Sequence, residues 1–259
     1  EVYHELGSAL AGRRRDERQA HVSTALAALL PRQCAPHEES RHLTVAIADL
    51  RDSHILNDPA VDRLFLPLTP GNVHGLSRIG RRLTGREHQV AWDLPFILFD
   101  HQWAEFQGAI RLLVDRGFTT FRLNNLGHFR FFEGISGLRL LAGYRLFSLN
   151  SQAISAWRDL GASEVILYLE DERENLAEIM ARETGIESAV QVYGAVPLIT
   201  SRIPIRGVRS DHAVTSDRGE GYRVTSRAGL TVLRSETDFS LAGRLREIQG
   251  FGCNRFIVD

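Results

Sequence analysis

The chain has 259 residues, 43% of them hydrophobic, and its 31 basic residues nearly balance 32 acidic ones. One sizeable core fits this length, and the charge balance excludes an overall field that attracts nucleic acid or an anionic membrane. No apolar run reaches the roughly 18 residues that span a bilayer, and no charged-then-apolar leader begins the chain, so we expect a cytoplasmic protein without a membrane partner.

Two residue types limit the chemistry. The two cysteines, Cys34 and Cys253, are too few for a self-contained four-cysteine zinc or iron–sulfur site, so we expect reduced thiols and no cofactor. Whether either thiol joins a site with another segment stays open. The chain has no lysine, and arginine does not lose its proton, so Schiff-base aldolase and pyridoxal-phosphate mechanisms are excluded.

Residues 1–41 form the first predicted unit. Apolar positions such as Val22, Leu26 and Leu29 recur at helical spacing beside an arginine-rich face, which predicts a helix. The segment PRQCAPHEES that follows has the composition of a linker.

Residues 42–259 carry eight short strand-like runs, apolar on both faces as in buried parallel strands. They are residues 43–49, 61–67, 88–94, 119–124, 138–144, 164–170, 189–194 and 255–259. Helical patterns over residues 101–117, 151–161 and 170–185 lie between them and end at glycine. This alternation predicts an α/β fold, a TIM-like (β/α)8 barrel.

The predicted barrel is incomplete or distorted at two places. The connection RDSHILNDPA between the first two strands is too short for a full helix, and no helix follows the last strand. We expect the amino-terminal helix to cover that second gap.

Residues 197–236 break the alternation. The runs GYRVTSR and GLTVLRS have period-two patterning around Gly221 and Gly229, which predicts a β-hairpin insertion after the seventh strand. Such an insertion leaves the barrel at its carboxyl face, so we expect a small β-rich cap over the mouth, with Asp217 and Arg218 in its turn.

The second half of the chain resembles the collagenase-like peptidase family, number thirty-two among peptidases of unknown mechanism. Its pattern "gdY-LN-fNs-A", followed by "LG---v-lS-E", is matched within residues 142–170. The matching residues are Tyr144, Leu146, Leu149, Asn150, Ser151, Ala153, Leu160, Gly161 and Glu170. The order agrees from about residue 88 onward, and the chain is most similar to the carboxyl-terminal barrel of the long members.

The resemblance implies a peptidase scaffold, but its iron–sulfur signature is missing. Members that bind a cluster have cysteines shortly after the glycine that ends the seventh strand, and some of them support hydroxylation of RNA bases or quinone precursors. Here Gly194 is followed by Ala195 and Val196, and the family's preceding glutamate falls on Ala189.

Polar residues at the carboxyl ends of the predicted strands are the candidate site residues, because ligands meet barrels there. They are Asp49, Asp93, Asn124, Asn125, Asn150, Glu170, Tyr193 and Asp259. Asn150 is equally explained as a helix N-cap, and Glu170 as an acidic first-turn residue. If Asp49, Asp93 and Glu170 converge with His128, they form a metal site or an acid/base pair.

Two further clusters suit anionic ligands or stacked rings. Arginines in the insertion have the fixed fork that binds carboxylates or phosphates, although a solvated surface explains them equally. They are Arg202, Arg206, Arg209, Arg218 and Arg223. The segment FRFF (129–132) mixes a cation with aromatic rings, which core packing also explains. The adjacent Ser210, Asp211 and His212 do not have triad geometry, since a triad joins different segments.

Three functions follow from these patterns. The leading hypothesis is a substrate- or partner-binding barrel beside a catalytic part upstream in the same polypeptide or in a partner subunit. The second is a peptidase or other hydrolase that uses strand-end carboxylates. The third is a part in RNA modification through the arginine-rich insertion. The expected ligand is an anionic small molecule, a peptide or RNA.

Overall fold

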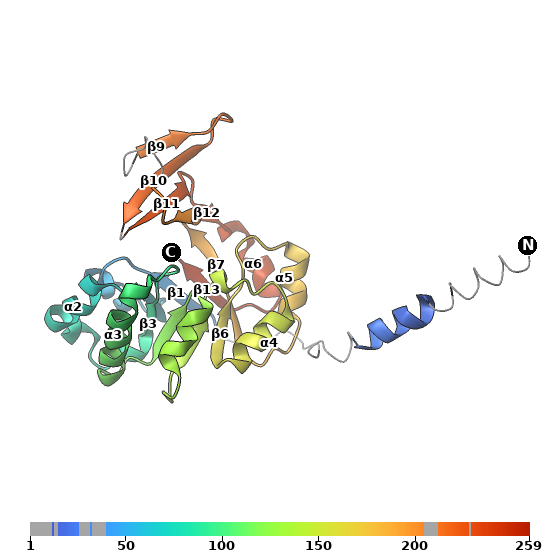
Figure 1. The fold of residues 1–259 in the computed structure, drawn as a ribbon, viewed down its shortest axis with the longest axis horizontal. Coiled ribbons are helices and arrows are strands. Elements are labelled where there is room, and N and C mark those ends of the chain that lie inside the picture. The colour runs from blue at the N-terminus through green and yellow to red at the C-terminus, as the bar shows by residue number, and fades with distance from the viewer. Residues whose placement is uncertain (1–11, 13–14, 26–31, 33–39, 205–211, 228) are drawn as a thin grey trace, which may run out of the picture.

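The computed structural model describes residues 12, 15–25, 32, 40–204, 212–227 and 229–259. Eight parallel strands form its centre: β1 (His42–Ala46), β2 (Arg63–Pro67), β3 (Val90–Asp93), β4 (Thr120–Leu123), β5 (Arg139–Ala142), β6 (Ala162–Ile166), β7 (Glu187–Gly194) and β13 (Arg255–Val258). Each pairs with its neighbour, and β7 pairs with both β6 and β13, so the sheet closes into a barrel (Figure 1). The predicted TIM-like barrel is confirmed.

Five α-helices in the described part of the chain surround the barrel: α2 (Pro70–Ile79), α3 (Trp103–Asp115), α4 (Ser151–Asp159), α5 (Arg173–Met180) and α6 (Leu245–Gly250). Short 3-10 helices complete the connections: η1 (Leu50–Asn57), η2 (Gly80–Leu83), η3 (Glu87–Gln89), η4 (Asp100–Gln102), η5 (Leu126–Phe132), η6 (Tyr144–Leu146) and η7 (Ala242–Arg244). After β1 and β4 only the 3-10 helices η1 and η5 lead to the next strand, so the barrel is distorted as predicted.

Three predicted elements differ from the structure by three residues or more. Strand β1 ends at Ala46 rather than at residue 49. Strand β6 spans 162–166 rather than 164–170, so Glu170 lies in a turn beyond the strand. Helix α5 begins after its N-cap Glu172 and ends at Met180, so it is shorter than the predicted 170–185. Glu170 therefore neither ends a strand nor opens a helix.

Two apolar layers hold the barrel together. The larger lies between the strands and the outer helices and includes Trp92, Phe121 and Ile110. The smaller fills the barrel interior with Phe65, Ala91, Leu141, Ile166, Ala189 and Ile257, one from each of six strands. Because side chains alternate along a strand, residues two positions further on also face the interior. The barrel is thus a packed core whose polar layers lie at its two ends.

The amino end of the barrel is closed by an ion network. Arg63 Nη1 donates to both carboxylate oxygens of Glu164 at 2.9 and 3.0 Å, and these two side chains are 5% and 2% exposed. Arg139 and Arg255 each lie 3.8 Å from the same carboxylate and also pair with Glu187. Two glutamates and three arginines therefore fill the floor of the barrel.

A four-stranded antiparallel sheet, here called the cap, follows β7. Its strands are β8 (Pro197–Ser201), β9 (His212–Thr215), β10 (Gly221–Arg227) and β11 (Leu230–Ser235), in the order β8-β11-β10-β9. The predicted β-rich insertion is confirmed, with four strands rather than one hairpin, and Asp217 and Arg218 lie in the turn before β10. Strand β12 (Phe239–Ser240) then returns antiparallel to β7.

The cap extends from one side of the barrel mouth to the other. It leaves from β7, yet a Cβ on Gly229, at the turn between β10 and β11, would lie 3.9 Å from the Phe99 ring. Phe99 follows β3, which stands opposite β7 in the barrel. Figure 1 shows the cap above the barrel, at the end where the chain terminates after β13.

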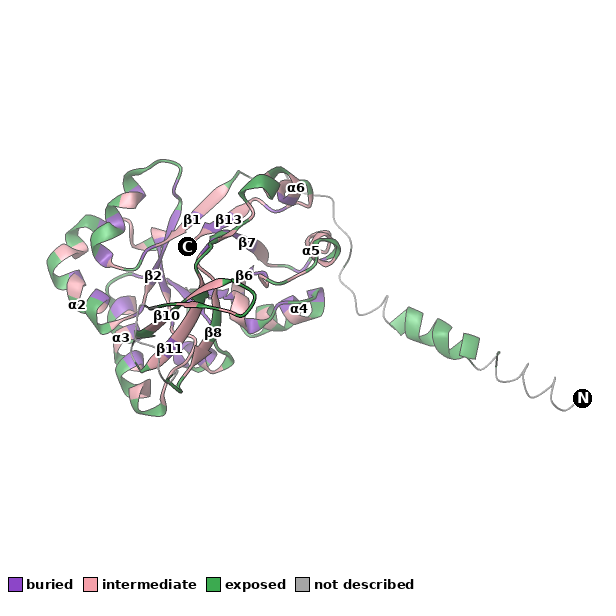
Figure 2. Ribbon diagram, turned by 90° about the horizontal axis from the view of Figure 1, so that it is seen from above, coloured by how far each residue is buried: buried purple, intermediate pink, exposed green. Residues whose placement is uncertain are grey.

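Residues 15–25 form a helix that lies away from the barrel in both views (Figures 1 and 2), and all of them are exposed. The expectation that the amino-terminal helix covers the gap after the last strand is therefore wrong for these residues. None of the described helices is long and apolar enough to span a bilayer.

Candidate functional site

A hydrogen-bonded cluster of Asp93, Arg122 and Asn124 lies at the carboxyl end of the barrel interior. Arg122 donates from Nε and Nη2 to the two oxygens of Asp93, with Nε at 2.6 Å. Asn124 Nδ2 donates to Asp93 Oδ1 at 2.7 Å and to the Leu94 carbonyl at 2.6 Å. Both oxygens of Asp93 are therefore engaged by neighbours from β4.

Strand alternation explains this cluster. Ala91 belongs to the inner apolar layer, so Asp93 faces the interior two residues later. On β4, Phe121 and Leu123 belong to the outer core, which leaves Arg122 and Asn124 facing inward.

Gly143 makes room for the Asn124 side chain. A Cβ at this position would lie 2.2 Å from Asn124 Oδ1 and 2.9 Å from the Leu123 carbonyl. The backbone after β5 therefore fixes the amide that holds Asp93.

Arg122 is the group with unused bonding capacity. Its guanidinium lies 4.2 Å from the centre of the Phe65 ring, and its Nη1 is buried with no hydrogen-bond partner in the described part of the chain. Burial alone would lower the pKa of Arg122, but the Asp93 carboxylate and the more distant Asp259 raise it, so the cation is retained. A charged donor thus remains free at the top of the barrel.

Tyr144, Gln191 and Asp259 complete the surroundings of Arg122. Burial raises the pKa of Tyr144, which packs against the inner apolar layer. A Cβ on Gly194 would lie 2.8 Å from Asp259 Cβ and 3.0 Å from Gln191 Nε2, so Asp259 and Gln191 flank the same glycine. Gln191 Oε1 is buried with no hydrogen-bond partner among the described residues. Around the mouth, the described part of the chain thus contains a buried donor, on Arg122, and a buried acceptor, on Gln191, that lack partners.

His128 is buried beside this cluster. Its Nδ1 accepts the Asn124 backbone N–H at 3.3 Å, and its Nε2 is buried without a partner. Burial lowers the pKa of His128 to about 4, against the opposing effect of Asp93. The ring is therefore a neutral part of the support for Asn124 at pH 7.

The other predicted carboxylates do not join Asp93. Asp49 caps η1 and binds Arg51 Nε at 3.0 Å on the surface, while Glu170 is exposed in its turn. Within the described residues, no three His, Cys, Asp or Glu side chains form a group suited to a metal ion. The predicted convergence with Glu170 and Asp49 is therefore not found.

Three polar candidates make local hydrogen bonds. Asn150 accepts the Ala153 N–H at 2.8 Å and caps α4, and Asn125 caps η5 through Gly127. Tyr193 is exposed at the end of β7, and its hydroxyl donates to Asp238. Asn124 is the candidate amide that joins the cluster at the mouth.

The two basic or aromatic segments have different positions. Arg202 lies 5.8 Å from the centre of the Phe99 ring, and Arg218 is exposed in its turn. Arg223 on β10 stands directly opposite Arg234 on β11. Arg206, Arg209, Ser210 and Asp211 lie outside the described residues. Phe129, Phe131 and Phe132 are buried in the outer core, which contradicts a ring-stacking role.

In the described part of the chain, the positions at which cluster-binding members of the resembled family have cysteines hold none. Pro197 opens β8 three residues after Gly194, where cluster-binding members have cysteines. Cys253 is buried near the amino end of β13, and burial raises its pKa to about 11, so it remains a thiol. Cys34 lies outside the described residues.

No family model and no curated protein matches the chain. It is similar to the solved structure of the U32 peptidase Mk0906, with a TM-score of 0.48 and 12% identity over 64% of this chain and 74% of that chain. That structure carries the name of the family that the sequence motifs resemble. At this identity the similarity assigns no activity, so function has to be argued from the site.

Sequence reasoning missed Arg122, Gln191 and Gly143. Arg122 and Gln191 lie within strands rather than at their ends, so the strand-end rule passed over them. The available signal was alternation: Gln191 stands two residues after Ala189, a small residue of the inner layer.

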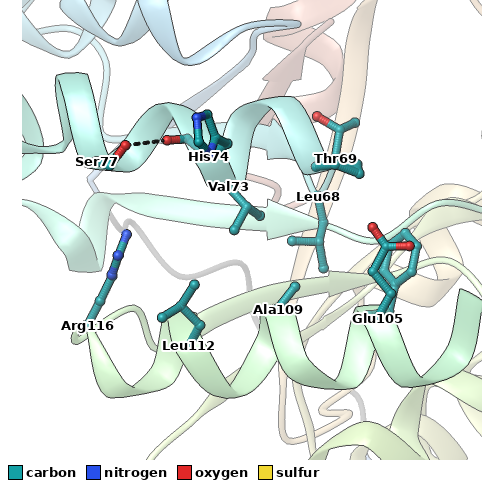
Figure 3. A pocket seen from close by; sticks show the side chains of 11 residues that line it. Leu68, Thr69, Val73, His74, Ser77, Glu105, Ala109, Leu112 and Arg116 are labelled. Carbon is teal, nitrogen blue, oxygen red and sulfur yellow. Dashed lines mark hydrogen bonds between the residues drawn. The ribbon is translucent and has the colours of Figure 1, made fainter.

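A groove of about 400 Å³ lies elsewhere, between α2 and α3 (Figure 3). Its walls are mainly Leu68, Val73, Phe106, Ala109 and Leu112, and Arg116 and Glu105 lie at opposite ends. It is outside the barrel, whereas barrel ligands meet the carboxyl ends of the strands. The mouth is therefore the stronger candidate.

Proposed function

We propose that this chain is a peptide-binding barrel of the collagenase-like peptidase type, which holds its ligand at the carboxyl mouth under the cap and does not cleave it. The observation that carries the proposal is the state of the Asp93–Arg122 pair: both carboxylate oxygens accept hydrogen bonds, while Arg122 Nη1 is buried with no partner among the described residues. Cleavage is then expected from another segment of the same polypeptide or from a partner subunit.

The engaged carboxylate argues for binding rather than catalysis. A general base needs an oxygen that can reach the proton it removes, and both oxygens of Asp93 already accept charged or amide donors. Asp49 is paired with Arg51 in the same way on the surface. Each of these carboxylates is therefore held in an ion pair with an arginine, which favours a structural role over proton transfer.

The free groups at the mouth suit a peptide. A peptide brings carbonyl oxygens for Arg122 Nη1 and N–H groups for Gln191 Oε1, and its terminal carboxylate would suit the guanidinium as well. The apolar layer beneath, with Phe65 and Ile166, would receive side chains rather than charges.

Fluorescence anisotropy tests the proposal with a probe peptide, a fluorescein-labelled peptide of alternating valine and threonine flanked by serines. We expect saturable binding and recovery of intact peptide after long incubation. Gln191→Leu keeps the side-chain volume and removes the unpaired acceptor together with the amide N–H groups, so it should weaken binding. Arg111→Met, at an exposed position on α3, is the matched surface control.

Cleavage of the probe that is lost on substitution of Asp93 would overturn the proposal in favour of a hydrolase. Absence of any peptide binding, or identical binding by Gln191→Leu, would remove the mouth as the binding site.

RNA is a second candidate ligand, favoured by one observation. Arg223 and Arg234 are direct cross-strand partners on one face of the cap, and both are exposed. Like charges placed opposite each other repel, and a phosphate between them would relieve that repulsion. Binding to phosphates weakens steeply as salt rises, so RNA binding that is absent at low salt, or unaffected by R223Q/R234Q, rules this candidate out.

A further inference from the structure

The cap has an open strand edge. β8 pairs with β11 on one side only, and no backbone hydrogen bond from the described residues occupies its other side. In an antiparallel strand, alternate residues direct N–H and C=O groups away from the partner. The outer side of β8 therefore presents donors and acceptors at the spacing of an extended chain.

Exposed apolar side chains lie along this edge. Leu198 is 49% and Ile199 is 52% exposed, and Ile203, just beyond the strand, is 75% exposed. Native sheets usually protect an edge with charges, proline, a bulge or a covering segment. Here Pro197 occupies only the first position of β8, and the register against β11 shifts at Leu198, whereas Ile199–Ser201 keep a regular register.

The opposite edge of the cap lacks these features. β9 has four residues, His212–Thr215, and no large hydrophobic side chain described on it is markedly exposed. The two edges of the cap therefore differ. The exposed apolar side chains belong to β8, the edge strand that follows the barrel strand β7.

Exposed apolar residues also follow neighbouring barrel strands. Phe147, after β5, is 53% exposed and its ring is tilted against that of Tyr168, after β6, with ring centres 5.1 Å apart. Tyr193, at the end of β7, is 39% exposed. These side chains therefore follow three consecutive barrel strands at their carboxyl ends, and the last of these strands leads into β8.

We propose that an extended peptide pairs with the open edge of β8 as a fifth strand of the cap, with its side chains against Leu198 and Ile199. Backbone pairing supplies binding in such complexes, and alternate side chains supply preference. The inference deepens the proposed function, since the peptide is the ligand assigned to the mouth, and it predicts a ligand that is extended and apolar rather than folded. A second copy of this chain is the other occupant such an edge could take.

Hydrogen exchange with the probe peptide tests the pairing. We expect slower exchange at the amides of Leu198–Ser201 on peptide binding and no change in β9. The same peptide with its internal amides N-methylated cannot donate to the edge, and should bind at least about ten-fold more weakly. Leu198→Lys with Ile199→Lys should weaken binding comparably, while Leu160→Lys, at a 50% exposed leucine on the far end of α4, should not.

Equal binding of the methylated peptide, or protection that appears in β9 instead of β8, would overturn the inference. A dimer at the protein concentrations used, dissociated by the lysine variants, would assign the edge to a second copy. Failure of the proposed function is recognised separately. If peptide binding depends on Gln191 but not on β8, the proposed function holds and the pairing with β8 is wrong. If binding depends on β8 but not on Gln191, the peptide pairs with β8 and the mouth is not its binding site.

Discussion

Arg122 and Asp93 are each buried because the other is present. Arg122 is 9% and Asp93 is 17% exposed, so removing one partner leaves a charge with little access to water. We expect Arg122→Met to destabilise the fold by about 3 kcal/mol or more. The double variant Asp93→Leu/Arg122→Met should lose less than the sum of the two single changes. Urea denaturation of the four proteins measures this coupling, and strictly additive losses would contradict the pairing.

His128 makes stability depend on pH in a predictable direction. Its pKa falls from the usual 6.5 to about 4 on folding, so the unfolded chain takes up a proton first as the pH is lowered. The contribution is therefore full above pH 6.5 and is lost as the pH falls toward 4, roughly 3 kcal/mol in total.

His128→Asn keeps an acceptor for the Asn124 N–H but does not titrate. Between pH 7 and pH 4.5 its stability should fall less than that of the wild type, as measured by urea denaturation at each pH. His74→Asn, at an exposed position of α2, is the matched control. Parallel profiles for wild type and His128→Asn would show that burial of this ring has no such effect.

At the scale of elements, the turn after β5 determines whether the mouth cluster can form. Gly143→Ala places a methyl group 2.2 Å from Asn124 Oδ1, so the amide has to move away from Asp93. We expect a loss of about 1–3 kcal/mol and weaker binding of the probe peptide. Gly108→Ala, on α3 with no atom within 4 Å of the new methyl group, should instead stabilise by roughly 0.5–1 kcal/mol. Thermal unfolding of both variants gives the comparison; equal effects would contradict a steric role for Gly143.

The strands were predictable because short apolar runs alternate with helical patterns. This alternation is recognisable even when the predicted ends of an element are wrong by a few residues. Helix α2 was missed for a physical reason. It contains Pro70, Gly71 and Gly75, which weaken a helical pattern, and it is held by tertiary contacts of Asn72, whose side chain bonds Ala48, Leu50 and Pro67. Such contacts are not visible in the local sequence.

The site was predictable only in part, and strand boundaries explain the difference. Asp93 and Asn124 were found because β3 and β4 end where their patterns end. Asp49 and Glu170 were chosen because β1 and β6 were expected to continue three or four residues beyond Ala46 and Ile166. A parallel strand that ends early leaves its last polar residue in a loop, outside the barrel interior.

At the scale of the whole molecule, the residues that stabilise the barrel and those proposed to bind the ligand lie at opposite ends of it. The apolar layer around Phe65 and Ile257 divides two polar ends. The amino end is an ion network buried within the fold, and the carboxyl end has unpaired groups under the cap. Substitutions at the floor should therefore change the free energy of unfolding without changing the ligand site. In α/β barrels generally, the amino-terminal face serves stability and the carboxyl-terminal face serves function.

Glu164 gives the test of this separation. It is the carboxylate shared by Arg63, Arg139 and Arg255. Burial, Arg63 and Arg255 lower the pKa of nearby His42. Glu164→Leu leaves these arginines at the barrel floor with only Glu187, so we expect a loss of about 3–5 kcal/mol in urea denaturation. Glu174→Ala, which breaks a largely exposed pair with Arg173 on α5, should cost less than about 1 kcal/mol. Below its melting temperature, folded Glu164→Leu should bind the probe peptide with unchanged affinity, because the apolar layer lies between the floor and the mouth; weaker binding by the folded variant would contradict the separation of the two ends.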